Sequence, residues 1–158
     1  MSLRDNIALA RPDASDEEII RAAKRAQAHE FIIDLPDGYG TKVGQGGHRF
    51  SAGQAKRIAI AQSLLNDPPV MLLDEPTQGM GLEDVDRIRQ LIKRVAADRT
   101  VLMVEHNMNV VSSIADTISV LQRGQVIAEG PYALVSENPQ VLEAYMGRAE
   151  AELRGAHG

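Results

Sequence analysis

Apolar residues recur at helical spacing in three segments of the chain and run consecutively in two others. The helical segments are residues 15–29, 53–65 and 83–95. The first begins with Ser15 and carries Glu18 three positions later, the capping-box pattern of a helix start. The apolar stripes of the three segments are Ile19, Ala22, Ala23 and Ala26; Ile58, Ala61 and Leu65; and Val85, Ile88, Ile92 and Val95. We therefore expect three amphipathic helices. Lys56, Arg57 and Gln62 should point away from the second stripe.

The two consecutive apolar runs, residues 70–73 and 100–104, are too short and too apolar for surface helices. Such runs are typical of parallel strands that are buried on both faces. Residues 117–121 and 125–129 flank an Arg123-Gly124 turn and predict a β-hairpin, followed by short helices at 132–136 and 139–146. The order helix, strand, helix, strand predicts an α/β fold with a helix-covered parallel sheet.

Composition narrows the functional classes. The chain has 158 residues, 44% of them hydrophobic, which suits one globular domain with a real core. A net charge of -5 argues against a nucleic-acid surface, so no nucleic-acid partner is expected. The chain contains no Cys, which excludes thiolate chemistry. No apolar run approaches the roughly 20 residues of a membrane helix, and we expect a cytoplasmic protein.

Candidate chemistry follows the two predicted strands. Asp74 and Glu75 come directly after the first strand, and His106 follows the second. Ligands bind at the carboxyl ends of parallel strands, so these residues should share one edge. One carboxylate can hold a hydrated Mg²⁺ against phosphates, and its neighbour can polarise a water molecule. The alternative interpretations are an acidic turn at Asp74 and Glu75 and a structural role for His106. The shared position of these three residues at the strand ends favours a functional site.

A second candidate site opens the middle helix. In Ser51-Ala52-Gly53-Gln54, free backbone N–H groups at a helix start can bind phosphate. An ordinary Ser N-cap is the alternative, and the placement ahead of the acidic strand favours function. The loop Gln78-Gly79-Met80-Gly81 can bend tightly, although a plain strand-to-helix connection explains it as well. The chain contains no Gly-Lys dipeptide and so no phosphate-cradling P-loop of its own.

These motifs, in this order, resemble the ATP-binding cassette (ABC) transporter ATPases. Ser51-Ala52-Gly53-Gln54 is similar to the family signature, usually Ser-Gly-Gly-Gln, and residues 70–75 are similar to the Walker B strand. Gln78-Gly79-Met80-Gly81 occupies the D-loop position. The resemblance implies Asp74 as the magnesium-side ligand, Glu75 as the catalytic base and His106 as the switch histidine. It also implies ATP and Mg²⁺ as cofactors.

The two halves resemble different branches of this family. Residues 2–69 are similar to exporters, and residues 70–147 are similar to branched-chain amino-acid importer ATPases. The resemblance implies a helical signature subdomain (1–69) and the C-terminal part of a P-loop NTPase-like core (70–148), followed by a disordered tail (149–158). The family's base-stacking aromatic, P-loop and Q-loop lie upstream of the segment that these residues match. We therefore expect a truncated cassette with little ATPase activity alone and with apolar sheet surface left exposed.

Cassette nucleotide sites form between two subunits, which implies a second cassette subunit and transmembrane transporter subunits as partners. The chain would then lie at the inner face of the cell membrane through those partners. Our first hypothesis is a transport ATPase fragment that couples ATP hydrolysis to transport. A second is a non-catalytic module that supplies its signature to a complete cassette. A third, a phosphoacceptor domain using Asp74, is disfavoured because no matching acidic cluster lies near the N-terminus.

Overall fold

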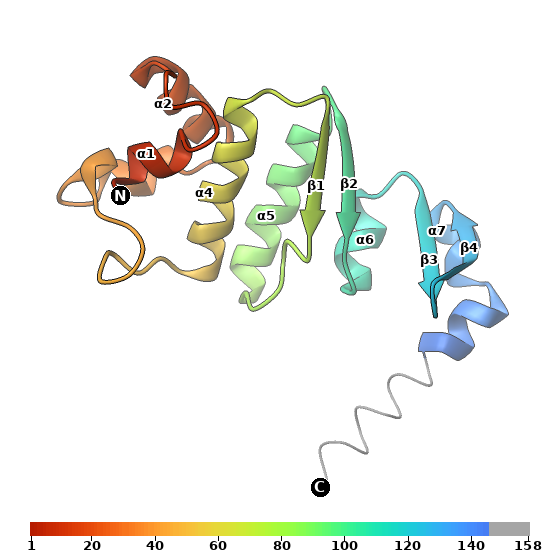
Figure 1. Ribbon diagram of the computed structural model, residues 1–158. Coiled ribbons are helices and arrows are strands. Elements are labelled where there is room, and N and C mark those ends of the chain that lie inside the picture. The colour runs from red at the N-terminus through yellow and green to blue at the C-terminus, as the bar shows by residue number, and fades with distance from the viewer. Residues whose placement is uncertain (146–158) are drawn as a thin grey trace, which may run out of the picture. The chain divides into compact units, whose positions relative to one another are not determined.

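The computed structural model describes residues 1–145, and these separate into two compact units (Figure 1). The first unit is Met1–Asn107, and the second begins at Met108. We describe each unit by itself. The domain boundary expected after residue 69 was placed by sequence motifs, whereas the two units are separated by compactness. That boundary stays a prediction. The tail expected at 149–158 lies outside the described residues.

The first unit contains most of the helices and a parallel pair of strands. In chain order its elements are α1 (Leu3–Ile7), α2 (Asp16–Arg25), α3 (His29–Ile33), the 3₁₀ helix η1 (Gly38–Gly40), α4 (Ala52–Leu65), β1 (Val70–Asp74), α5 (Leu82–Val95) and β2 (Thr100–Val104). The three predicted helices correspond to α2, α4 and α5. The predicted α/β fold is confirmed.

The first predicted helix ends earlier than expected, at Arg25 rather than His29. Gln27 adopts a left-handed backbone conformation, with φ of 53°. The N–H of Gln27 donates to the carbonyl of Lys24, and the N–H of Ala28 donates to the carbonyl of Ala23. These two bonds form a Schellman motif, which satisfies the last carbonyls of the helix and stops it. Gly or Asn usually marks this position, so Gln27 gives no sequence signal.

The two predicted strands form a parallel pair. Val70 lies opposite Thr100, and the register continues to Asp74 opposite Val104. Figure 1 shows α5, which joins the strands, beside β1 and between β1 and α4. Met71 and Leu73 are buried. Alternate residues face the other way and stay more than half exposed: Val70, Leu72, Leu102 and Val104. The prediction of strands buried on both faces is therefore wrong for one face, and the expected exposed apolar sheet surface is present.

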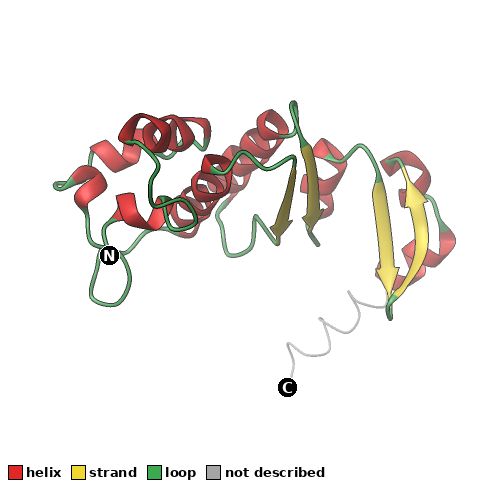
Figure 2. Cartoon of the chain, turned by 45° about the horizontal axis from the view of Figure 1, so that its top comes forward, coloured by secondary structure: helices red, strands yellow, loops and turns green. Residues whose placement is uncertain are grey.

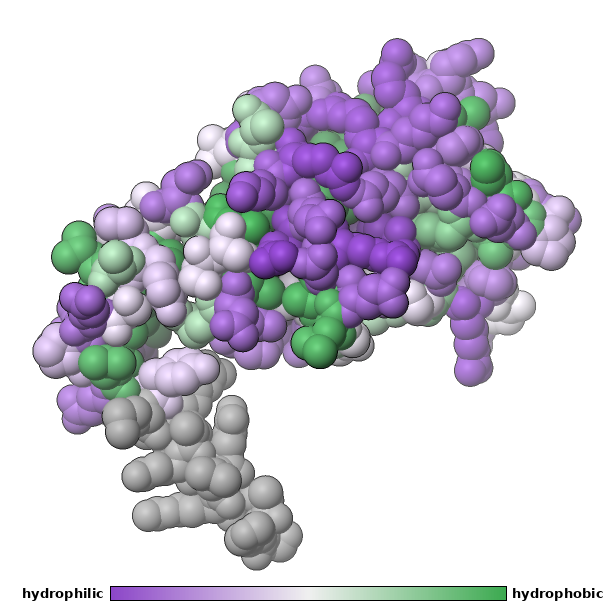
Figure 3. Space-filling view, turned by 180° about the vertical axis from the view of Figure 1, so that it is seen from behind, coloured by the Kyte–Doolittle hydropathy of each residue, from purple (hydrophilic) through white to green (hydrophobic). Residues whose placement is uncertain are grey.

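The apolar stripes of α4 and α5 are buried as predicted except at Val85, which is only half-buried. The buried members are Ile58, Ala61 and Leu65 on α4 and Ile88, Ile92 and Val95 on α5. Arg57 was expected to point away from the stripe, but it is also buried. Its guanidinium donates to the carbonyl of Gln27 at 2.9 Å and lies 4.8 Å from the centroid of the Phe31 ring. The Gln27 carbonyl and the Phe31 ring thus stabilise the positive charge of the buried Arg57 guanidinium. Figure 3 shows the side opposite to the view of Figure 1, where hydrophilic residues predominate at the surface of the described residues.

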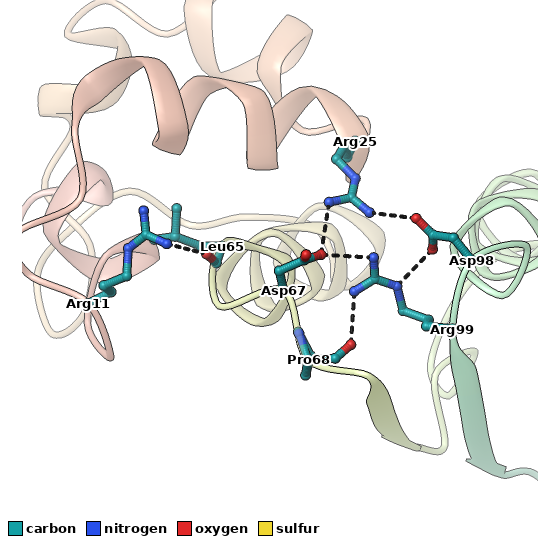
Figure 4. A network of polar contacts seen from close by, with 7 residues as sticks. All are labelled: Arg11, Arg25, Leu65, Asp67, Pro68, Asp98 and Arg99. Atoms are coloured by element: carbon teal, nitrogen blue, oxygen red, sulfur yellow. Dashed lines mark hydrogen bonds and ion pairs between the residues drawn. The ribbon is translucent and has the colours of Figure 1, made fainter.

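A polar network holds the amino ends of both strands (Figure 4). The side chain of Arg99 is 4% exposed and donates to the carbonyl of Pro68 at 3.1 Å. It also pairs with Asp67 and Asp98, at 3.0 Å each. Arg25 of α2 reaches the same two carboxylates, at 3.5 and 3.4 Å. The network ties α2 to the loops that precede β1 and β2, at the end of the sheet opposite to Asp74.

The second unit contains the predicted hairpin (Figure 2). Its elements are α6 (Met108–Ile114), β3 (Ile118–Gln122), β4 (Gln125–Gly130) and α7 (Tyr132–Ser136), and residues 139–145 are helical. β3 and β4 pair antiparallel. Arg123 and Gly124 both have positive φ, as a two-residue type I′ turn requires. No helix among residues 1–145 is long and apolar enough to cross a membrane.

Candidate functional site

Asp74 and Glu75 lie where β1 ends. Asp74 is exposed, and its carboxylate makes no hydrogen bond or ion pair with another described residue. Its main-chain carbonyl accepts a hydrogen bond from Lys56 Nζ at 3.2 Å. Glu75 has a φ of 41°, and its N–H donates to the carbonyl of Val104 at 2.8 Å. This bond extends the ladder by one step and fixes Glu75 beside the end of β2.

His106 lies beside Glu75. Its Nδ1 is 3.4 Å from Oε1 of Glu75 and 3.8 Å from Oε1 of Glu105. The side chains of His106 and Glu75 are 54% and 37% exposed, so both are open to a ligand. The ends of two adjacent parallel strands thus bring together two residues that are far apart in sequence, as the strand pairing predicts.

Glu105 is a member of this cluster that sequence reasoning missed. Its side chain is 1% exposed, and both carboxylate oxygens are fully used. Oε2 accepts from Thr77 Oγ1 at 2.6 Å and from the Thr77 N–H at 3.3 Å. Oε1 accepts from the N–H groups of His106 and Asn107, at 3.0 and 3.2 Å. Strand register was the available signal, because it places the residues after β1 and β2 side by side.

Burial and hydrogen bonding act in opposite directions on Glu105. Burial works to raise the pKa of its carboxyl group, because it disfavours the charged form. Hydrogen bonds from Thr77 and from the N–H groups of Asn107 and His106 outweigh burial and leave the pKa below its ordinary value. Glu105 is therefore an anion at neutral pH, and it is held by neutral donors.

The start of α4 carries the second predicted site. Ser51 is the N-cap, and its Oγ accepts from the N–H of Gln54 at 3.1 Å. Gln54 Oε1 accepts in return from the N–H of Ser51 at 3.0 Å. This capping box leaves the N–H groups of Ala52 and Gly53 without partners inside the helix. The first turn of α4 thus offers two donors and the positive end of a fourteen-residue helix to an anion.

Gly53 lies against the first turn of α5. A Cβ atom at Gly53 would lie 2.6 Å from Cγ of Asp84 and 2.8 Å from each of its carboxylate oxygens. Only glycine therefore fits here while Asp84 keeps its position. The contact links the predicted phosphate-binding turn directly to the helix that follows the 78–81 loop. Asp84 gave no sequence signal, because it reads as an ordinary first-turn acid.

The loop from Gln78 to Gly81 is mostly exposed and connects β1 to α5. The N–H of Gln78 donates to the carbonyl of Glu75 at 3.2 Å, and Gly79 has a φ of 73°. Gly81 is the N-cap of α5. Within the described residues the structure does not bring the side chain of Gln78 into a hydrogen bond with the Glu75–His106 pair.

The side chains at this edge could supply Mg²⁺ with one of its ligands, but they could not complete its coordination shell. Among residues 1–145, no group of three or more His, Cys, Asp or Glu side chains could hold a metal ion alone. Mg²⁺ commonly takes one or two carboxylates and completes its shell with water and substrate phosphates. The unpaired, exposed carboxylate of Asp74 suits that arrangement. Asp74, Glu75 and His106 line an open edge of the sheet.

Comparison with known proteins gives two family matches. The model for "ABC transporter" matches residues 1–78. The model for "Branched-chain amino acid ATP-binding cassette transporter" matches residues 125–151. The first match covers the exporter-like segment and extends into the first residues of the importer-like segment, and the second lies almost wholly within the importer-like segment.

Individual relatives are much longer than this chain. A proposed multidrug export ATP-binding/permease protein of Staphylococcus aureus is 41% identical over 131 residues, which are 83% of this chain and 22% of the relative. The proposed multidrug export ATP-binding/permease protein YgaD of Bacillus subtilis is 44% identical over the same share of each. This chain therefore spans about a fifth of the length of these relatives.

A solved structure is similar along nearly the whole chain. It is that of a bacterial Atm1-family ABC exporter with ATP bound, at a TM-score of 0.79 and 34% identity. The similarity covers 94% of this chain and 26% of the exporter chain.

Proposed function

Because this chain belongs to the ATP-binding cassette (ABC) family of transporter ATPases, we propose that it binds and hydrolyses ATP together with a second cassette subunit. The observation that carries the proposal is the Glu75–His106 pair, 3.4 Å apart, next to the unpaired carboxylate of Asp74. Hydrolysis of a phosphoanhydride uses a general base, a hydrogen-bond donor and an oxygen ligand for a metal ion. Glu75, His106 and Asp74 could supply these three groups at one edge of the sheet.

We assign the roles by position. Asp74 is the ligand on the magnesium side; bound Mg²⁺ would supply neutralisation of phosphate charge. Glu75 accepts the proton of the attacking water. His106, within reach of Glu75, bonds the terminal phosphate or the same water and limits its orientation. The exposed fractions of Glu75 and His106 leave room for that substrate.

The α4 turn would serve a different nucleotide from the Glu75–His106 pair, because in this family one subunit gives the P-loop and the Walker B strand and the other subunit gives the signature. The N–H groups of Ala52 and Gly53 would bond phosphate oxygens of ATP held by the second cassette, with Ser51 and Gln54 framing the turn. The loop from Gln78 to Gly81 would lie at that subunit boundary. We further propose transmembrane transporter subunits as partners, which place the chain at the inner face of the membrane.

The test uses the full chain mixed with a P-loop-bearing ABC cassette, with phosphate release from Mg²⁺–ATP as the readout. The variant Glu75→Gln should lower turnover about 100-fold or more, because a general base contributes at least that much. Glu83→Gln is the matched control: Glu83 is an exposed acid on α5, and its one ion-pair partner among residues 1–145 is Arg87. Equal turnover of Glu75→Gln and the unsubstituted chain would refute the catalytic role. The chain alone should turn over little ATP, since its 158 residues contain no Gly-Lys phosphate cradle.

The capping box and Gly53 also favour a second function, a non-catalytic module that lends its α4 turn to a complete cassette. In that case ATP should promote association with the partner, and Ser51→Arg should abolish it by filling the turn. Association that survives in Glu75→Gln with unchanged partner turnover would favour the module over the ATPase. Size-exclusion chromatography with and without ATP distinguishes these outcomes.

A further inference from the structure

The two reacting side chains of the proposed site stand on different loops. Glu75 belongs to the turn after β1, and His106 belongs to the segment after β2. The strand ladder itself ends with the bond from the N–H of Glu75 to the carbonyl of Val104. Beyond that point another interaction must fix the position of His106 relative to Glu75.

Glu105 supplies the connection. One carboxylate oxygen takes both donors of Thr77, two residues after Glu75, and the other takes the N–H groups of His106 and Asn107. The side chain is 1% exposed, so bulk water has little access to these bonds. Among the described residues, no Lys or Arg forms an ion pair with Glu105. Glu105 therefore accepts hydrogen bonds from neutral donors in two loops, the loop after β1 and the segment after β2.

We propose that Glu105 is a positioning residue, whose buried carboxylate fastens the segment after β2 to Thr77 and thereby holds His106 within reach of Glu75. This inference rests on the proposed function for its catalytic consequence. It adds a residue that itself contacts neither ATP nor the attacking water.

The chemistry of the four donors requires a carboxylate. A Gln side chain could accept from His106 and Asn107 through its oxygen, but its NH₂ group would then face the N–H of Thr77, donor against donor. Glu105→Gln should therefore keep the His106 side of the connection and lose part of the Thr77 side. Glu105→Ala should lose both sides. Thr77→Val keeps the shape and removes the short bond from Oγ1, whereas Thr77→Ser keeps it.

The first measurement is amide hydrogen exchange of the full chain by NMR, which needs no nucleotide. In Glu105→Ala the N–H groups of His106 and Asn107 should exchange at least about 10-fold faster, while the N–H of Glu75 stays protected by Val104. Glu129→Ala is the matched control, since Glu129 accepts from Ser119 Oγ at 2.7 Å in the second unit. Unchanged exchange at His106 and Asn107 in Glu105→Ala, or in Thr77→Val if the Ala variant does not fold, would overturn the proposal.

The second measurement is turnover with the P-loop-bearing cassette. Glu105→Ala and Thr77→Val should lower kcat about 10-fold or more with the KM for ATP nearly unchanged, and Thr77→Ser should restore kcat. In a His106→Ala background, Glu105→Ala should add less than a 2-fold loss, because the positioned group is already gone. Full additivity in that background would overturn the positioning role. If Glu75→Gln leaves turnover unchanged, the proposed ATPase function fails, and the exchange measurement still decides whether Glu105 joins the two loops.

Discussion

Gly53→Ala tests the closest contact between α4 and α5. In the structure, the added methyl would lie 2.6 Å from Cγ of Asp84, whereas ordinary contact begins at 3.4 Å. The Asp84 carboxyl or one of the helices must therefore move. Gly53 has an ordinary helical backbone, so Ala itself suits the position. The contact alone decides the sign of the effect.

The magnitude follows from two opposing contributions. Overpacking of this kind costs about 1–3 kcal/mol. Replacing Gly by Ala in a helix gains up to about 1 kcal/mol. Gly53→Ala should therefore lower the free energy of unfolding by about 1 kcal/mol. In an Asp84→Ala background the obstacle is absent, and the same substitution should raise the free energy of unfolding by up to about 1 kcal/mol.

Urea unfolding followed by far-ultraviolet circular dichroism measures both backgrounds, since the chain has no Trp for fluorescence. The expected coupling between positions 53 and 84 is about 1–3 kcal/mol. Gly40→Ala is the control, because its added methyl would meet only an ordinary contact at 3.9 Å. If Gly53→Ala changes stability equally in the two backgrounds, the close contact does not exist in solution.

Three further predictions concern stability and titration. Hydrogen bonds from Arg99 and, to a lesser extent, from Arg25 lower the pKa of Asp67. A hydrogen bond from Arg99 also lowers the pKa of Asp98, because it outweighs the opposite effect of burial. Their stabilisation is fully present above the unfolded pKa of about 3.9 and is lost as pH falls through the lower folded values. Acid unfolding of the variant with Asp67→Asn and Asp98→Asn should therefore depend less on pH below about 4 than that of the unsubstituted chain; equal dependence would contradict this. Burial raises the pKa of Tyr39 to about 12, so spectrophotometric titration should show one fewer late-ionising phenol in Tyr39→Phe. Leu91→Ala should cost about 2–5 kcal/mol, because Leu91 is fully buried, whereas Leu82→Ala on the same helix, where Leu82 is 91% exposed, should change stability by less than about 0.5 kcal/mol.

Sequence patterns predicted the elements that have strong periodicity. The apolar stripes of α4 and α5 mark elements whose burial dictates residue type, and the two short aliphatic runs mark strands of which only one face is buried. The end of α2 was not predictable, because the Schellman motif depends on a left-handed Gln27, a residue that rarely takes this position. The burial of Arg57 also escaped prediction, since its partners, the Gln27 carbonyl and the Phe31 ring, come from another part of the chain.

The grouping of the candidate site residues was predictable where strand order alone determines proximity. Asp74, Glu75 and His106 end adjacent parallel strands, so their shared edge follows from the strand assignment. Glu105 and Asp84 were not found, because their roles depend on side-chain bonds and close approach between elements, which no spacing encodes. In both cases a polar residue beside a recognised motif makes a specific contact with another loop or helix.

The uncovered face of the β1–β2 pair makes the stability of the chain dependent on a polypeptide that covers this face. Four aliphatic side chains, Val70, Leu72, Leu102 and Val104, remain more than half exposed on a parallel sheet. Covering them would contribute about 3–6 kcal/mol, if about half of each side chain's burial energy is still available. That is comparable to the whole stability of many small domains. The melting temperature of this chain should therefore depend on the concentration of whatever polypeptide covers the face, as mass action requires.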